Sequence, residues 1–113
     1  MAQEVLGTFL NRNRPGRQIR LAEVTKLVSS YYDISLDLLR SKTRTKQVAY
    51  ARQVAMYLCR ELTGASLNQI GQRFGGRDHT TVHHAWQKIT QLEQTSADVR
   101  REIQDLTRSL QSA

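Results

Sequence analysis

The stretch "GGRDHTTVHHA" at Gly75–Ala85 decides the fold of its part of the chain. Its two glycines predict a turn, and Asp78 can cap a following helix by accepting a hydrogen bond from a free backbone N–H of the first helical turn. Just before it, Ser66 and Gln69 have the spacing of a capping box, which predicts the start of a short helix. A short helix, a glycine-containing turn and a longer helix make a helix-turn-helix, predicted here over residues 66–93.

Apolar side chains recur at three- and four-residue steps in the rest of the chain as well. The pattern predicts a helix over residues 19–32, a short helix capped by Ser35, a long helix over residues 45–63 that ends at Gly64, and a C-terminal helix through Val99, Ile103, Leu106 and Leu110. No segment shows the alternation of a strand. We therefore predict an all-α fold, a helical bundle containing a helix-turn-helix and preceded by a connector segment.

The chain is strongly basic for its length. Its 113 residues include 17 Lys and Arg against 10 Asp and Glu, for a formal net charge of +7. Six of the cations lie between residues 38 and 60, where no acid occurs: Arg40, Lys42, Arg44, Lys46, Arg52 and Arg60. This charge pattern favours a polyanionic partner, either nucleic acid or an acidic membrane surface. The length allows one small domain, which argues against a large multi-step enzyme.

The histidines raise the question of a metal or catalytic site. His79 and His83 are four residues apart, as zinc ligands on a helix often are, but Thr80 replaces the glutamate of the H-E-x-x-H motif and no third ligand follows. The single cysteine, Cys59, falls on the apolar face of its helix and is predicted to be a core residue. No nucleophile elbow and no phosphate-binding glycine loop occur. We expect a binding module that is not an enzyme and holds no metal or cofactor.

The helix that follows the glycines has one polar face. If Val82, Ala85 and Ile89 face the core, the outward face carries Thr80, His84, Gln87 and Gln91, with Thr81, His83 and Lys88 at its flanks. Such side chains donate and accept hydrogen bonds at base edges and phosphates, and the N-terminal end of this helix is the end that enters the major groove in helix-turn-helix proteins. We predict that this helix reads double-stranded DNA.

The block "SKTRTKQVAYARQVAMYLCRELTGASLNQIGQRFGGRDHTTVHHAWQKI", residues 41–89, closely resembles the C-terminal DNA-binding domain, domain IV, of the bacterial chromosomal replication initiator DnaA. The core "GGRDHTTV" and the preceding "ARQVAMYLCRELT" carry the resemblance, which extends over roughly residues 20–95. The resemblance implies binding to DnaA boxes, short asymmetric sites like TTATCCACA at replication origins and some promoters. It thus implies a role in the initiation and regulation of chromosomal replication, in the cytoplasm with the nucleoid.

The resemblance also implies roles for single residues. Base edges would be contacted by Asp78, His79, Thr80 and Thr81 in the major groove and by Arg44 in the minor groove. The negative potential of a narrow A·T-rich minor groove attracts arginine, which agrees with the basic run around this residue. Phosphate contacts would come from Lys46, Arg52, Gln53, Arg60, Thr63, Leu67, His84 and Lys88.

Members of this family carry an ATP-binding AAA+ module upstream of the DNA-binding domain. We expect residues 1–18 to be a connector and the end of such a module, with ATP bound only there, and residues 19–113 to be the DNA-binding domain. The chain would then be either an excised domain or a stand-alone relative. An alternative is peripheral binding to acidic phospholipids through the arginines of residues 12–20 and the apolar residues 5–10.

Binding to DNA should depend strongly on salt. About six to eight phosphate contacts, of which only the cationic ones count fully, predict a slope of log affinity against log salt concentration between about −3 and −6. Fluorescence anisotropy titrations of a labelled duplex at several salt concentrations measure this slope. A slope near zero would contradict a backbone-binding role for the basic run.

Overall fold

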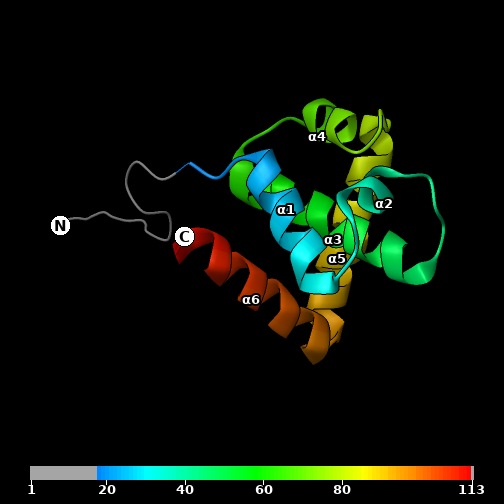
Figure 1. Cartoon of the computed structure of the whole chain (residues 1–113). Helices are drawn as coiled ribbons and strands as arrows, with labels where there is room; N and C mark the ends of the chain where they lie inside the picture. Colours follow the sequence, from blue (N-terminus) through cyan, green and yellow to red (C-terminus); the bar gives the residue numbers. More distant parts are fainter. Residues whose placement is uncertain (1–17, 113) are drawn as a thin grey trace.

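The computed structural model describes residues 18–112 of the chain, and within this range it is all-α (Figure 1). Its six helices are α1 (Leu21–Tyr32), α2 (Leu36–Arg40), α3 (Lys46–Thr63), α4 (Leu67–Arg73), α5 (His79–Thr95) and α6 (Ala97–Ser112). The described part contains no strand, so the predicted fold class is confirmed. None of its helices combines the length and the hydropathy of a membrane-spanning segment.

Side-chain and glycine caps set the helix ends where the sequence predicts them. The Ser35 hydroxyl accepts a hydrogen bond at 3.1 Å from a backbone N–H in the first turn of α2. Gly64 ends α3 with a φ of +75°, a left-handed conformation that glycine adopts without steric cost. At the start of α4, the Ser66 hydroxyl accepts from the Gln69 N–H at 3.1 Å, and the Gln69 side chain accepts from the Ser66 N–H at 2.9 Å. The predicted capping box is therefore confirmed.

The long helix α3 runs through the centre of the bundle. It packs against α1 on one side and α5 on another, with α2, α4 and α6 completing its surroundings. Six consecutive residues, 54–59, are buried. The sequence predicts an amphipathic helix with one apolar face, whereas neighbouring helices cover almost the whole circumference of these turns. Burial all round is the property of a core helix rather than a surface helix.

Tyrosine hydroxyls inside the bundle find carboxylate partners on other helices. Tyr32 of α1 and Tyr50 of α3 both donate to Glu102 of α6, at 2.7 and 2.9 Å. Tyr57 of α3 donates to Glu93 of α5 at 2.7 Å. Burial, assisted by the bond to Glu102, raises the pKa of Tyr50 to about 12. These bonds satisfy polar groups that would otherwise be costly to bury, and they tie α6 and α5 to α3.

The turn of the helix-turn-helix brings two backbones into direct contact. The Arg77 N–H donates to the Gly71 carbonyl at 2.9 Å, and a Cβ atom on Gly71 would overlap the Arg77 carbonyl. Only glycine permits this approach of α4 to the residues that precede α5. This backbone contact therefore fixes the position of α4 relative to the start of α5.

The thiol of Cys59 should not react in the folded protein. Cys59 is fully buried in α3, and burial raises the pKa of its thiol to about 12, so that almost none of it is the reactive thiolate near pH 8. A chromogenic disulfide reagent should label it only after unfolding in concentrated guanidinium chloride. Rapid labelling of the native chain would contradict the predicted core position.

Candidate nucleic-acid interface

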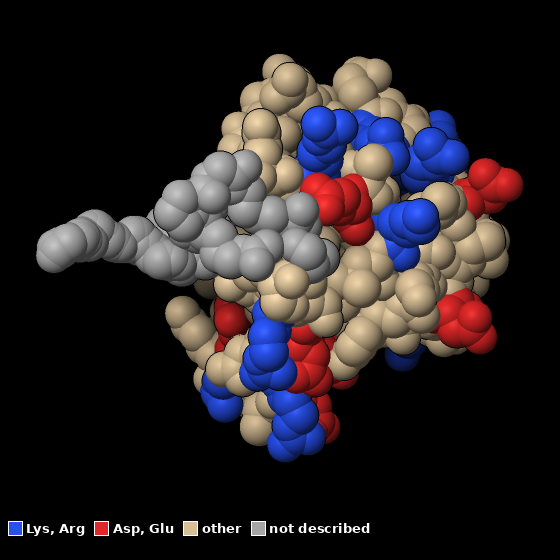
Figure 2. All heavy atoms as spheres, turned by 60° about the vertical axis from the view of Figure 1, so that its left-hand side comes forward, with Lys and Arg blue, Asp and Glu red and all other residues tan. Residues whose placement is uncertain are grey.

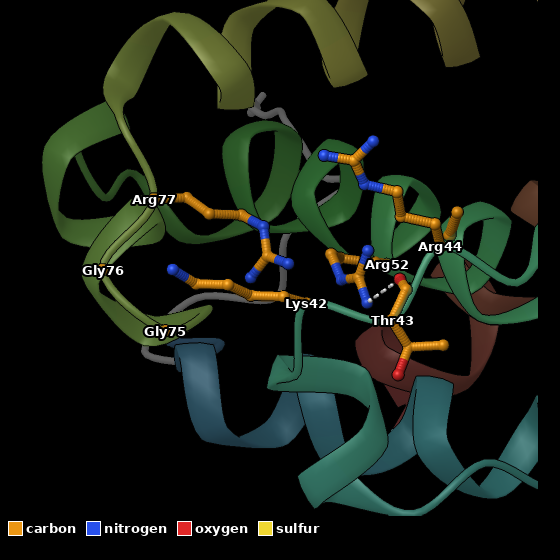
Figure 3. Close-up of a pocket in the computed structure, with 8 residues that line it drawn as sticks. Lys42, Thr43, Arg44, Arg52, Gly75, Gly76 and Arg77 are labelled. Carbon is orange, nitrogen blue, oxygen red and sulfur yellow. Dashed lines mark hydrogen bonds between the residues drawn. The ribbon is translucent and has the colours of Figure 1, made fainter.

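A cation-lined hollow lies between the α2–α3 loop and the turn before α5. It has a volume of about 430 Å³ and is lined by Lys42, Thr43 and Arg44 of the loop, Ala49 and Arg52 of α3, and Gly75, Gly76 and Arg77 of the turn. Four of these side chains are cations and none is an acid. In Figure 3 the Arg44 side chain extends above Arg52, the Arg77 guanidinium lies beside Arg52, and the Lys42 side chain runs below Arg77 toward Gly76.

A second hollow of about 270 Å³ continues the first between α3 and α5. The two share Ala49, Arg52 and Arg77, and we refer to them together as the basic groove. The second hollow adds polar side chains from two helices: Gln53 from α3, and Thr81, His84 and Lys88 from α5. The groove thus brings together six residues predicted to contact DNA: Arg44, Arg52, Gln53, Thr81, His84 and Lys88.

The groove is lined by two partly buried guanidinium groups, those of Arg52 and Arg77. Burial lowers the pKa of both Arg52 and Arg77, and the charge of Arg77 lowers the pKa of Arg52 further. Arginine remains protonated under such shifts, so both positive charges persist. An anion in the groove would offset their repulsion. The groove lining contains no acid, whereas on the face drawn in Figure 2 the Lys and Arg side chains lie among Asp and Glu side chains.

The polar face of α5 is exposed as the sequence predicts. Val82, Ala85 and Ile89 are buried, whereas the four residues at the centre of the predicted outward face, Thr80, His84, Gln87 and Gln91, are exposed. Thr81 and Lys88 at the flanks are exposed too, and His83 is half-buried. An exposed face on the second helix of a helix-turn-helix is the surface such proteins turn toward the major groove.

The first turn of α5 carries its predicted cap. The Asp78 carboxylate accepts from the Thr80 N–H at 3.4 Å, and a carboxylate oxygen lies 3.1 Å from Nδ1 of His79. All three residues are exposed at the helix N-terminus. The capping role is therefore confirmed, and the roles of these residues in base contact stay predictions.

His83 takes part in packing beside the interface. Its ring stacks on Trp86 with centroids 6.0 Å apart, and its Nδ1 lies 3.4 Å from a guanidinium nitrogen of Arg60. The Arg60 guanidinium carbon lies 4.0 Å above the Trp86 ring, and the indole N–H donates to Glu61 at 2.8 Å. Across residues 18–112, no three His, Cys, Asp or Glu side chains come together as a metal site requires. That the chain functions without a metal stays a prediction.

Four of the predicted phosphate-contacting residues do not line the basic groove. Lys46 is exposed in the first turn of α3, and Arg60 is held half-buried against Trp86. The Thr63 hydroxyl donates to the Cys59 carbonyl at 2.6 Å, at the far end of α3. The fourth, Leu67, is the first residue of α4 and packs partly against the core. Nothing in the geometry tests whether these residues reach a phosphate.

Arg77 and Lys42 belong to the groove although the sequence did not identify them as site residues. Arg77 appears in the sequence only as part of the glycine turn. Its guanidinium donates at 2.6 Å to the carbonyl of Ser41, which lies 36 positions earlier in the chain. An arginine directly after two glycines was the available signal, but nothing local to the turn reveals a partner so distant in sequence.

The turn between α4 and α5, the exposed polar face of α5 and the acid-free groove define a helix-turn-helix protein of the DNA-binding class. Residues 21–89 match the family described as bacterial dnaA protein helix-turn-helix. The chain belongs to this family. A crystal structure of a DNA replication initiation factor is similar over 81% of this chain, with 32% sequence identity and a TM-score of 0.73. The match covers 28% of that relative, so the chain spans little more than a quarter of its length.

The predicted connector and the predicted membrane-binding segments fall almost entirely on residues 1–17, which lie outside the described residues. Of the arginines in residues 12–20, Arg20 alone is described. It is exposed, and its backbone N–H donates to the Glu23 side chain at 2.9 Å at the start of α1. No observation in the described part favours the membrane alternative.

Two substitutions of Asp78 should separate its cap from its interaction with DNA. Asp78→Ala removes the cap and should lower the free energy of unfolding by about 1 kcal/mol, whereas Asp78→Asn keeps a capping oxygen and should lower it by less. Urea titrations followed by circular dichroism measure both. If the carboxylate accepts a hydrogen bond from a cytosine amine, Asp78→Asn should still weaken specific binding. Equal stability losses in the two variants would show that the cap contributes little.

Proposed function

We propose that the chain binds double-stranded DNA specifically at DnaA-box-like sites and acts in the initiation and regulation of chromosomal replication. Membership of the dnaA helix-turn-helix family and the similarity to a DNA replication initiation factor support the proposal. The observation that carries it is the continuity of the exposed polar face of α5 with the basic groove, whose lining includes five Lys and Arg side chains and no Asp or Glu. A helix that reads bases needs adjoining positive charge to hold the phosphates.

In this proposal the first turn of α5 enters the major groove. Asp78 accepts from a cytosine amine with the carboxylate oxygen that does not cap the helix, and His79, Thr80 and Thr81 meet the neighbouring base edges. His84, one turn further along, and Lys88, a turn beyond it, reach the phosphates that border the groove. Both are exposed and line the second hollow, which supports a contact with the backbone rather than with bases.

Arg44 takes the minor-groove role. It is exposed on the loop between α2 and α3, and its side chain extends over the basic groove (Figure 3). A guanidinium in a narrow A·T-rich minor groove is favoured by the negative potential there, while the minor groove distinguishes little beyond A·T from G·C. Arg44 therefore contributes a preference for A·T pairs at one end of the site.

The chain acts in this proposal as a binding domain that is not an enzyme and uses no cofactor of its own. The chain spans little more than a quarter of the similar solved structure, so the proposal assigns it DNA binding alone and none of the other activities of a whole initiator. An upstream AAA+ module would bind ATP, and residues 1–18 would connect it to this domain.

Two matched variants of α5 should distinguish base reading from phosphate contact. Thr80 and Lys88 are both exposed on this helix, the first in its N-terminal turn and the second two turns along. Thr80→Ala should weaken binding to a consensus box by about 1–3 kcal/mol and leave binding to a scrambled duplex unchanged. Lys88→Ala should weaken both duplexes by a similar factor and flatten the salt slope by about one unit.

Anisotropy titrations with the two labelled duplexes measure these effects, and thermal melts control for folding. Equal losses on both duplexes for Thr80→Ala would contradict base reading by α5. Equal affinity of the unaltered chain for the consensus and the scrambled duplex would contradict the proposed specificity altogether.

A further inference from the structure

The Arg77 side chain joins the turn before α5 to the end of α2. Its Nη2 donates to the Ser41 carbonyl at 2.6 Å, and its Nη1 lies 3.4 Å from the Arg40 carbonyl and donates to the Phe74 carbonyl. One guanidinium thus bridges backbone oxygens of two segments that are more than 30 residues apart in the sequence. The planar fork of arginine suits such bridging, which the point charge of a lysine cannot reproduce.

Arg52 of α3 bonds to the same region, which consists of the end of α2 and the start of the α2–α3 loop. Its Nε donates to the Leu39 carbonyl at 2.9 Å and its Nη2 to the Thr43 carbonyl at 3.1 Å, the bond drawn in Figure 3. Arg52 is only 8% exposed. Together the two arginines meet the carbonyls of four of the five residues that immediately precede Arg44. The path of the loop up to Arg44 is therefore set by side chains from two other elements.

Gly75 adds a direct backbone contact between the turn and Arg40, the last residue of α2. A Cβ atom at this position would lie 2.7 Å from the Arg40 carbonyl oxygen, closer than real Cβ contacts allow. Gly76 has a similar positive φ, +78° against +82°, yet a Cβ there would meet nothing within 4 Å. The two glycines form a matched pair, because alanine strains the backbone at both positions but clashes with the end of α2 only at Gly75.

We propose that Arg77 is a positioning residue that couples the two DNA-reading elements. It holds the loop carrying Arg44 against the turn from which α5 begins, so that the minor-groove arginine and the major-groove helix meet DNA at a fixed offset. The effect of this coupling on DNA recognition rests on the proposed function. Its structural part concerns the free protein alone, and the two parts are tested separately.

Hydrogen exchange of the free protein, followed by NMR, tests the structural part. The reporter amides are Ser41, which donates to the Leu38 carbonyl, and Thr43, which donates to the Ser41 hydroxyl. Arg77→Lys and Gly75→Ala should each speed their exchange by about tenfold or more relative to the amides of α6, because the loop opens locally.

The controls for this experiment are Gly76→Ala, with the same backbone strain, and Arg101→Ala, which removes an exposed charge on α6. Neither should change the reporter amides relative to the amides of α6. Unchanged reporter exchange in Arg77→Lys, or an equal increase in α6, would overturn the proposal.

A double-variant cycle on DNA tests the consequence. Arg44→Ala and Arg77→Lys should each reduce the preference for A·T over G·C at the minor-groove end of the box by about fivefold or more. The double variant should lose no more than either single variant, because both act through Arg44. Discrimination at the bases facing α5 should stay within about twofold of the unaltered chain.

Additive losses in the double variant would show that Arg77 acts on DNA independently of Arg44. Equal losses at both ends of the box would show that Arg77 acts only through overall stability. Either outcome would overturn the coupling. If the unaltered chain does not distinguish a box from a scrambled duplex, the proposed function fails instead. The exchange experiment would still decide whether Arg77 holds the loop, so the two failures are distinguishable.

Discussion

The packing of α3 against α5 is the constraint on which the rest of the structure depends. The middle of α3 is buried all round, and Val82, Ala85 and Ile89 of α5 are buried with it. With this face committed to the core, α5 can present only its opposite, polar face to a partner. The same packing places α3 and α5 side by side as the walls of the second hollow, so one apolar contact both orients the polar helix and shapes the groove.

A second constraint comes from the backbone of the loop between α2 and α3. This segment has no regular structure, so its carbonyl groups need partners from elsewhere, and a buried carbonyl left without one costs about 1–3 kcal/mol. Arg52 supplies a partner for the Thr43 carbonyl and Arg77 for the Ser41 carbonyl. The same positive charges line the groove, so residues that stabilise the loop also make it attractive to a polyanion.

Much of the fold and part of the site could be predicted from the sequence. The capping box at Ser66, the end of α3 at Gly64 and the exposed face of α5 all depend on residues within one or two turns of each other, and the structure confirms them. Six of the predicted DNA-contacting residues line the basic groove, whereas others lie elsewhere, and their contacts with DNA stay predictions. Thr63 is bonded within its own helix, and Leu67 packs on the core, away from the groove.

By itself, the sequence determined what neighbouring residues decide: helix ends, the turn at Gly75 and Gly76, the two faces of α5 and the excess of positive charge. Only the tertiary structure decided which helix is enclosed and which cations face one another. Periodicity describes one helix in isolation, whereas burial depends on every helix that packs against it. The partners of Arg77 depend likewise on how α2 is folded back onto the turn, and hydrogen-bond partners so distant in sequence leave no local pattern.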